Sequence, residues 1–109
     1  MDNKARVLKL EYNDKYQRLI SKESGSHGLK MGHVVLKPGE SVGSHTTAER
    51  EEAIVVLKGD GEAQVGNDSA VKIRKNSVLY IPPWTDHDIK NTGTDILEYI
   101  FITSLAQDL

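Results

Sequence analysis

The strongest constraint on this chain is a regular alternation of short apolar runs and turn-forming segments. The runs are rich in Val, Ile, Leu and Tyr, and most segments between them are rich in Gly, Pro, Asn, Asp or Ser. This rhythm is typical of strands joined by tight turns. It predicts an all-β chain, folded as an antiparallel sandwich or small barrel. The predicted strands are residues 6–10, 16–20, 29–37, 52–58, 61–66, 70–75, 77–82, 87–91 and 95–103.

Length and charge restrict the domain organisation and the partners. A chain of 109 residues with 38% hydrophobic residues is expected to form one domain, over residues 1–109, with a small layered core. The formal net charge is −2, and lysines alternate with acidic residues, so we expect no nucleic-acid partner. The longest apolar run, AIVVL, is far shorter than the roughly 20 residues that span a bilayer, so we expect no membrane insertion.

The N-terminus and the absence of cysteine point to a cytoplasmic protein. The first residues, MDNKARVLKLEYND, contain neither the apolar region nor the cleavage site of a secretion signal. The chain has no cysteine, which excludes a disulfide framework and thiolate ligands. Histidine and carboxylate side chains are therefore the good metal donors that the sequence offers.

One segment has two competing interpretations. Thr46 and Glu49 stand at the spacing of a capping box, AEREEA is strongly helix-forming, and Gly59 is a suitable stop, which together predict a helix over 47–58. The β-branched IVV and the following KGDGE turn instead predict a strand and a hairpin. Local propensity favours the strand but does not exclude the helix.

The same segment carries a recognisable spacing. Gly39, His45, Thr47, Glu52 and Gly59 resemble the first cupin motif, G(X)5HXH(X)3,4E(X)6G. All these positions match except Thr47, which stands where the family has its second histidine. This motif covers residues 39–59.

A second spacing follows in the order that the family requires. Asn76, Pro82, Trp84, His87 and Asn91 resemble the second cupin motif, G(X)5PXG(X)2H(X)3N, with Pro82, His87 and Asn91 in register. This motif covers residues 76–91. Two motifs in the correct order within a small β-rich chain are fairly specific. The chain is thus similar to a small single-domain cupin, which implies a cupin-type β-barrel or jelly roll of two antiparallel sheets.

The resemblance also implies a metal site. In the family the ligands come from the motif positions that are His45, Glu52 and His87 here, while Thr47 replaces the fourth ligand with a hydroxyl. Two imidazoles and one carboxylate are the donors that non-haem Fe(II) oxygenases use. Affinity alone does not select the ion, so the expected cofactor is a divalent transition metal, namely Fe, Mn, Ni, Co or Zn.

Strand periodicity distinguishes the neighbouring carboxylates. If Glu52 faces inward with Ile54 and Val56, then Glu51 faces outward, because successive side chains of a strand point to opposite faces. Glu51 is the alternative ligand at the shorter family spacing. The outward set, with the apolar face of ILEYIFI, predicts a homodimer formed by sheet packing, as the resemblance also implies. The rest of that outward set is Ala53, Val55 and Leu57.

Further residues are candidates for the wall of a pocket. Ile54, Val56 and Met31 would form apolar walls beside Thr47. His33 lies in a predicted strand whose two faces are both apolar, so it is either a core histidine with a hydrogen-bond partner or a substitute for the missing ligand. Trp84 completes the candidates and forms a substrate wall or packs outside. His27, in a polar turn, is expected to be exposed and is not a candidate.

Three classes of function fit these residues. The first is a metal-dependent enzyme, an oxygenase or an isomerase, that acts on a small molecule inside the barrel. The second is a module that binds a small ligand without converting it. The third is a structural cupin without catalysis. Retention of His45, Glu52 and His87 favours the first class, and Thr47 keeps the other two open, because one fold hosts many functions.

Overall fold

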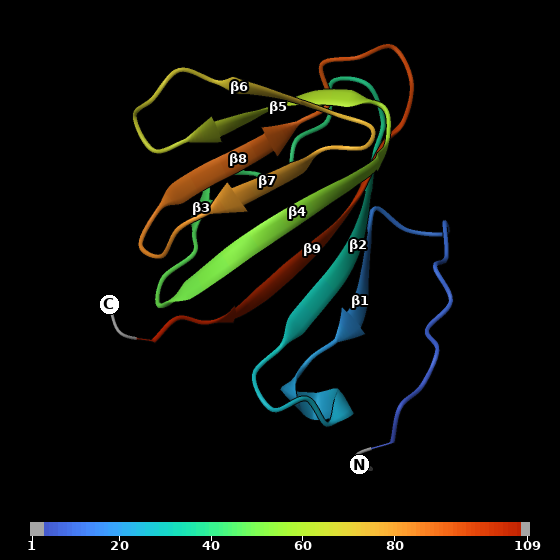
Figure 1. Cartoon of the computed structure of the whole chain (residues 1–109). Helices are drawn as coiled ribbons and strands as arrows, with labels where there is room; N and C mark the ends of the chain where they lie inside the picture. The colour runs from blue at the N-terminus through green and yellow to red at the C-terminus, as the bar shows by residue number, and fades with distance from the viewer. Residues whose placement is uncertain (1–3, 108–109) are drawn as a thin grey trace.

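Two antiparallel β-sheets packed face to face form the structure (Figure 1). The computed structural model describes residues 4–107. This architecture confirms the predicted all-β jelly roll of two antiparallel sheets. The elements are β1 (Tyr16–Ile20), a 3-10 helix η1 (Lys22–Ser24), β2 (Lys30–Leu36), β3 (His45–Thr46), β4 (Arg50–Lys58), β5 (Asp60–Val65), β6 (Val71–Arg74), β7 (Val78–Ile81), β8 (Asp86–Lys90) and β9 (Leu97–Leu105).

The strand order interleaves the two ends of the chain. One sheet has the order β1-β2-β9-β4-β7 and the other has the order β3-β8-β5-β6. Every pairing within the sheets is antiparallel. Consecutive strands therefore often lie in different sheets, and the long strand β4 faces β8 across the core. Within the described residues no helix is long and apolar enough to cross a bilayer.

The structure corrects one expectation from the sequence, decides between two interpretations and adds one strand. The predicted strand over 6–10 is wrong: this segment pairs with no sheet and is mostly exposed, and Val7 keeps 97% of its surface accessible. The strand predicted over 52–58 is confirmed by β4, which excludes the alternative helix over 47–58. Its β-branched residues find strands on both sides, so sheet pairing outweighs the local helix signals. The short strand β3 was not predicted.

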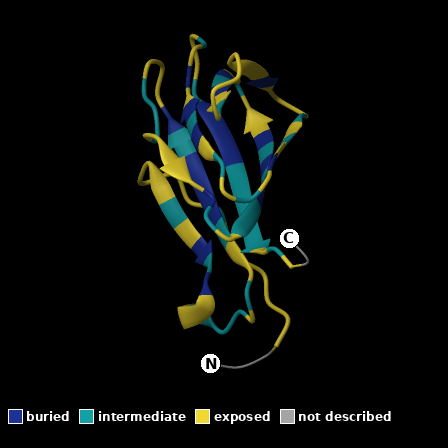
Figure 2. Ribbon diagram, turned by 90° about the vertical axis from the view of Figure 1, so that its left-hand side faces the viewer, coloured by how far each residue is buried: buried dark blue, intermediate teal, exposed yellow. Residues whose placement is uncertain are grey.

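The core lies between the inner faces of the two sheets. Buried residues alternate with exposed or half-buried residues along most strands (Figure 2). This is the pattern of strands with one face toward a core. Burial of these side chains supplies the main driving force for packing the sheets together. The core consists of Val34, Leu36, Ile54, Val56, Ala63, Ile73, Ile81, Ile89, Leu97 and Tyr99.

A polar cluster fastens the N-terminal segment to the outer face of the five-stranded sheet. His33 Nε2 lies 2.7 Å from Glu98 Oε2, and Tyr12 donates its hydroxyl hydrogen to the same oxygen at 2.8 Å. The Tyr12 ring also stands edge-on to the His33 ring, with centroids 5.1 Å apart. Gln17 donates to the Lys9 carbonyl at 3.0 Å. The segment is held by side chains rather than by a strand ladder.

Tight turns link the two sheets, and one of them leaves no room for a side chain. Gly59, between β4 and β5, has φ of 88°, and a Cβ there would lie 2.2 Å from the Ile96 carbonyl oxygen. Gly39 has nearly the same φ, 87°, but a Cβ there would meet nothing within 4 Å. The two glycines share a backbone requirement, and only Gly59 has a steric one.

The pair predicts two different costs of substitution. Gly39→Ala should lower the free energy of unfolding by about 1–2 kcal/mol, the cost of a left-handed backbone with a Cβ. Gly59→Ala should lower it further, by about 1–3 kcal/mol, because the backbone of residue 96 must move. Urea denaturation followed by tryptophan fluorescence measures both. Equal losses for the two variants would contradict the steric assignment.

Candidate metal centre

Two histidines meet because β3 pairs with β8. His45 is directly opposite His87 in this antiparallel pair, so both side chains lie on the same face of the sheet. Their ring centroids are 4.1 Å apart and the ring planes are inclined by 60°. The His87 side chain is buried, whereas His45 is exposed. The short strand β3 is therefore what brings the first motif to the second.

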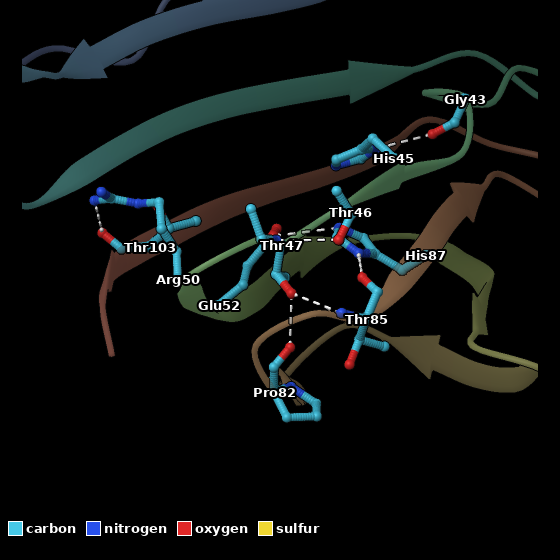
Figure 3. A network of polar contacts seen from close by, with 11 residues as sticks. Gly43, His45, Thr46, Thr47, Arg50, Glu52, Pro82, Thr85, His87 and Thr103 are labelled. Carbon is cyan, nitrogen blue, oxygen red and sulfur yellow. Dashed lines mark hydrogen bonds and ion pairs between the residues drawn. The ribbon is translucent and has the colours of Figure 1, made fainter. Parts of the chain in front are cut away.

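Backbone carbonyls orient both rings (Figure 3). His45 Nδ1 lies 2.9 Å from the Gly43 carbonyl oxygen, and His87 Nδ1 lies 3.1 Å from the Thr85 carbonyl oxygen. A carbonyl only accepts hydrogen bonds, so in each ring Nδ1 carries the proton. In a neutral imidazole this leaves the Nε2 lone pair free. Such a carbonyl contact is the usual partner of a histidine that ligates a metal.

Glu52 reaches the histidines from the opposite sheet. It projects from β4 with 8% of its surface exposed, and its Oε1 lies 3.3 Å from His87 Nε2. The geometry of this contact is not that of a hydrogen bond, and His87 Nε2 is a buried nitrogen without a hydrogen-bond partner among the described residues. A bare nitrogen lone pair beside a carboxylate requires a positive charge between them.

A divalent ion fits this requirement. One ligating atom each from His45, Glu52 and His87 lies within 4.8 Å of the other two. Ligands about 2.1 Å from an ion and at right angles to each other are roughly 3 Å apart, close to the separation of Glu52 and His87. The expected ligand residues are thus brought together. Glu51, the alternative ligand, faces outward and accepts a hydrogen bond from Tyr80 at 2.9 Å.

A proton is the other positive charge that this position can hold. Burial lowers the pKa of His87 and is the largest single influence on it. The Glu52 carboxylate, the Thr85 carbonyl and the charge of Asp86 act in the opposite direction and together raise the pKa above its ordinary value. The pocket around His87 therefore favours a cation, whether a proton or a metal ion.

Thr47 has a structural task next to the site. Its hydroxyl donates to the Pro82 carbonyl at 2.7 Å and accepts from the Thr85 amide at 3.1 Å (Figure 3). Both hydrogen-bonding functions of the hydroxyl are thus used by the loop that precedes β8. The same loop supplies the carbonyl that orients His87. Thr47 therefore fixes this loop instead of offering a further ligand. We call its two hydrogen bonds, to the Pro82 carbonyl and from the Thr85 amide, the clip.

The three donors line a cavity of about 470 Å³. Met31 and Thr47, both expected at the pocket, belong to its wall. Aromatic and cationic side chains extend the wall away from the donors. The other lining residues are Tyr16, Arg18, Ile20, Ser21, Glu23, Lys30, Val34, Val42, Thr46, Arg50, Ile89, Tyr99, Phe101 and Thr103.

The structure places the other expected pocket residues elsewhere. Ile54 and Val56 share the inward face of β4 with Glu52 but lie deeper, in the closed core. His33 points to the outer face of its sheet, where it binds Glu98. Trp84 is 68% exposed and does not line the cavity. Inward-facing residues line the cavity only at the end where the two sheets are open to solvent. Strand periodicity predicts which residues face inward but not which end is open.

An aromatic wall was missed by the analysis of the sequence. The rings of Tyr16 and Phe101 stack with centroids 5.9 Å apart and planes inclined by 14°. They come from β1 and β9, on either side of β2, and pack over Gly32. A Cβ at Gly32 would lie 2.3 Å from the Phe101 ring and 2.9 Å from the Tyr16 ring. The signal was this glycine inside a β-branched strand, which marks a close approach of neighbouring groups.

Comparisons with known proteins agree with this geometry. The family model described as Cupin domain matches residues 32–103. An oxalate-binding protein of Thermotoga maritima is 31% identical over 88 residues, which cover 80% of this chain and 72% of the relative. The structure of a predicted oxalate decarboxylase, also from Thermotoga maritima, superposes with a TM-score of 0.76 at 29% identity, over 84% of this chain and 79% of the other.

A more distant structure shows the fold alone. It is an RmlC-like cupin family protein with a double-stranded β-helix fold from Methanocaldococcus jannaschii. The TM-score is 0.80 at 18% identity, over 93% of this chain and 91% of the other. The arrangement of the two sheets is thus shared with a chain of much lower sequence identity.

The clip formed by Thr47 predicts a stability difference between two substitutions. Thr47→Val keeps the side-chain shape but leaves the Pro82 carbonyl and the Thr85 amide without their partner. It should lower the free energy of unfolding by about 1–3 kcal/mol. Thr47→Ser keeps the hydroxyl and should lose less than about 1 kcal/mol, the value of one methyl group. Chemical denaturation compares the two, and similar losses would contradict the clip.

Proposed function

This chain belongs to the cupin family, and we propose that it is a metal-dependent member that holds a small molecule in the cavity and acts on it as an oxygenase. The observation that carries the proposal is that ligating atoms of His45, Glu52 and His87, from two sheets, lie within 4.8 Å of one another. One of these atoms, His87 Nε2, is buried and has no hydrogen-bond partner among the described residues. Burying a carboxylate beside a histidine nitrogen lone pair costs free energy unless a cation lies between them.

Each residue of the site has a definable task. The two imidazole Nε2 atoms and the Glu52 carboxylate would hold Fe, Mn, Ni, Co or Zn, and the Gly43 and Thr85 carbonyls would keep the rings in the ligating tautomer. When bound, the metal would supply Lewis acidity and open positions for a chelating substrate and oxygen. Three protein donors leave more of those positions free than four would.

Tyr99 supplies a neutral polar group in the cavity. Burial raises the pKa of its hydroxyl, and the negative charges of Glu52 and Asp88 raise it further. The hydroxyl therefore stays protonated across the physiological range and can donate a hydrogen bond to a ligand. The apolar wall around it limits the access of water to the bound molecule.

A binding module without turnover is the second candidate. The Thermotoga maritima relative is named an oxalate-binding protein, and binding alone requires only the cavity and the metal. Oxygen consumption distinguishes the two candidates. An enzyme combines binding with turnover, whereas a module returns its ligand unchanged.

The outer face of the five-stranded sheet supports the homodimer. Val78 and Tyr80 on β7 are 67% and 57% exposed, and the register places Tyr80 beside Ala53 and Val78 beside Val55. The N-terminal segment is fastened elsewhere on this sheet, at β2 and β9. We propose that the apolar outer face packs against a second copy. On β9 the register adds Ile100 and Ile102 to this face.

We place the protein in the cytoplasm. The chain contains no cysteine, so its stability does not depend on the disulfides that exported small domains commonly use. Fractionation of cells that produce the full chain tests this location.

Metal content tests the proposed centre. Tag-free protein incubated with Fe(II) or Zn(II) and then dialysed should retain about one ion per chain, and His87→Ala should reduce this to near zero. His27→Ala removes an exposed histidine outside the cavity and should leave the metal content unchanged. Elemental analysis gives the stoichiometry. Equal metal in all three proteins would refute the centre.

Oxygen uptake then tests the chemistry of the metal-loaded protein. The Fe(II) form, prepared without oxygen, should consume oxygen when a small enediol, thiol or catechol is added. The Zn(II) form, which is redox-inert, should bind the same compounds without uptake. Thermal shift monitors binding in parallel. A thermal shift without uptake for every metal would favour the binding module.

A single charge on the outer face tests the dimer. Val78→Asp should convert a species of twice 12.1 kDa into one of 12.1 kDa, because an unpaired carboxylate would be buried between two apolar sheets. Val71→Asp, on β6 of the other sheet, is the matched control and should leave the dimer intact. Light scattering at micromolar concentration reports the mass. A monomeric wild-type protein would eliminate the proposed interface.

A further inference from the structure

Arg50 brings a positive charge into the cavity without a carboxylate partner. Its Nε donates to Thr103 Oγ1 at 2.9 Å, and its Nη2 donates to the carbonyls of Thr103 and Gly28. All three acceptors are neutral, and Arg50 forms no ion pair within the described residues. These bonds hold the guanidinium in place and use only Nε and Nη2. The Nη1 edge carries two further N–H groups.

Arg50 lies in the same cavity as the candidate metal ligands, on the far side of Glu52 from His87 (Figure 3). Arg50 and Glu52 are two residues apart on β4, so they share the inward face and their Cα atoms are about 6.6 Å apart. Figure 3 shows Arg50 and Thr103 on one side of Glu52, and His87 on the other. A ligand that touches both the candidate metal position and Arg50 would therefore have to extend along the cavity past Glu52 (Figure 3).

The wall of the cavity also favours a flat ligand. The stacked rings of Tyr16 and Phe101 line it, and aromatic faces and edges pack well against another aromatic ring. Val34 and Met31 add apolar surface nearby. The volume of about 470 Å³ lies within the range of roughly 300–1,000 Å³ that small-molecule sites usually have.

Another arginine of the cavity is a less suitable anion partner. Arg18 lies exposed on β1 with Glu23 nearby. The pKa of Glu23 is lowered, first by hydrogen bonds from its own backbone and from Ser21, and also by the charges of Arg18 and Lys30. The charge of Arg18 thus already acts on the Glu23 carboxylate. Arg18 is also exposed, whereas Arg50 is half-buried and held by three hydrogen bonds. This difference makes Arg18 a matched control for Arg50.

We propose that the ligand of this cavity is a small aromatic acid that chelates the metal at one end and places its carboxylate on the Nη1 edge of Arg50 at the other. The inference rests on the proposed metal centre and adds the chemical class of its ligand. The ring lies along the wall formed by Tyr16 and Phe101. Arg50 is therefore the residue that selects an acid over a neutral analogue.

Two probes that share a catechol ring, one with a carboxylate and one with a neutral hydroxymethyl group, test this selection. The full-length protein is loaded with Zn(II), which excludes redox chemistry, and its zinc content is measured on the same sample. Anaerobic calorimetry then compares 3,4-dihydroxybenzoate with 3,4-dihydroxybenzyl alcohol. We expect the acid to bind about tenfold more tightly, the value of one charge-assisted hydrogen bond. Equal affinities would overturn the proposal.

Two variants assign the selection to a residue. Arg50→Gln should bring the affinity ratio of acid to alcohol to within about twofold, while binding of the alcohol is retained. Arg18→Gln should keep most of the ratio. Loss of the ratio in Arg18→Gln alone would overturn the assignment to Arg50. Arg50 also forms hydrogen bonds with Thr103, so thermal unfolding is used to check that Arg50→Gln is folded. If this variant does not fold, the affinity ratio of the wild-type protein still tests the ligand class.

The zinc measurement separates this proposal from the one on which it rests. Protein that retains no zinc would overturn both the metal centre and the ligand class. Protein that retains one zinc per chain but shows no preference for the acid would overturn the ligand class alone. Stoichiometric zinc, a preference for the acid and its loss in Arg50→Gln would support both.

Discussion

The burial of one face of each strand is the constraint on which the rest of this structure depends. On β4, Ile54 and Val56 must face the core, so Glu52 faces inward with them. On β8, Ile89 imposes the same orientation on His87. Glu52 and His87 thus point into the interior because each lies two residues from a core residue on the same strand, and alternate residues of a strand face the same side. The candidate metal ligands His45, Glu52 and His87 extend the core pattern to the open end of the sheet interface.

The remaining positions of the two motifs hold the turns that make this packing possible. Gly39, Gly59, Asn76 and Trp84 occupy the motif glycines, and all four have positive φ. Asparagine adopts a positive φ readily, and tryptophan does so at a cost in free energy. The positive φ is therefore kept at Asn76 and Trp84, although neither residue is glycine. Asn91 is fully buried and donates to the backbone carbonyls of Leu36 and Asp95. These residues shape the barrel and are not among the candidate metal ligands.

The sequence predicted most strands and the grouping of three candidate ligands, and it missed what depends on tertiary neighbours. Motif spacing predicted that His45, Glu52 and His87 lie together, and the structure brings possible ligand atoms of the three within 4.8 Å of one another. The strand over 6–10 was wrong because β-propensity does not supply a neighbouring strand. The outward orientation of His33 was undetermined, because both faces of β2 are buried: one by the core, the other by the N-terminal segment. The cavity wall was missed because it depends on which end of the interface stays open.

Thr47, at a position where the family has a ligand, links the candidate metal centre to the stability of the loop before β8. An imidazole at this position could not donate to the Pro82 carbonyl and accept from the Thr85 amide in the same way as the hydroxyl does. The Thr85 carbonyl in turn orients His87. A fourth protein ligand and this clip are therefore alternatives at one position. The chain has the clip, and the cavity beside it also contains Arg50, which forms no ion pair within the described residues.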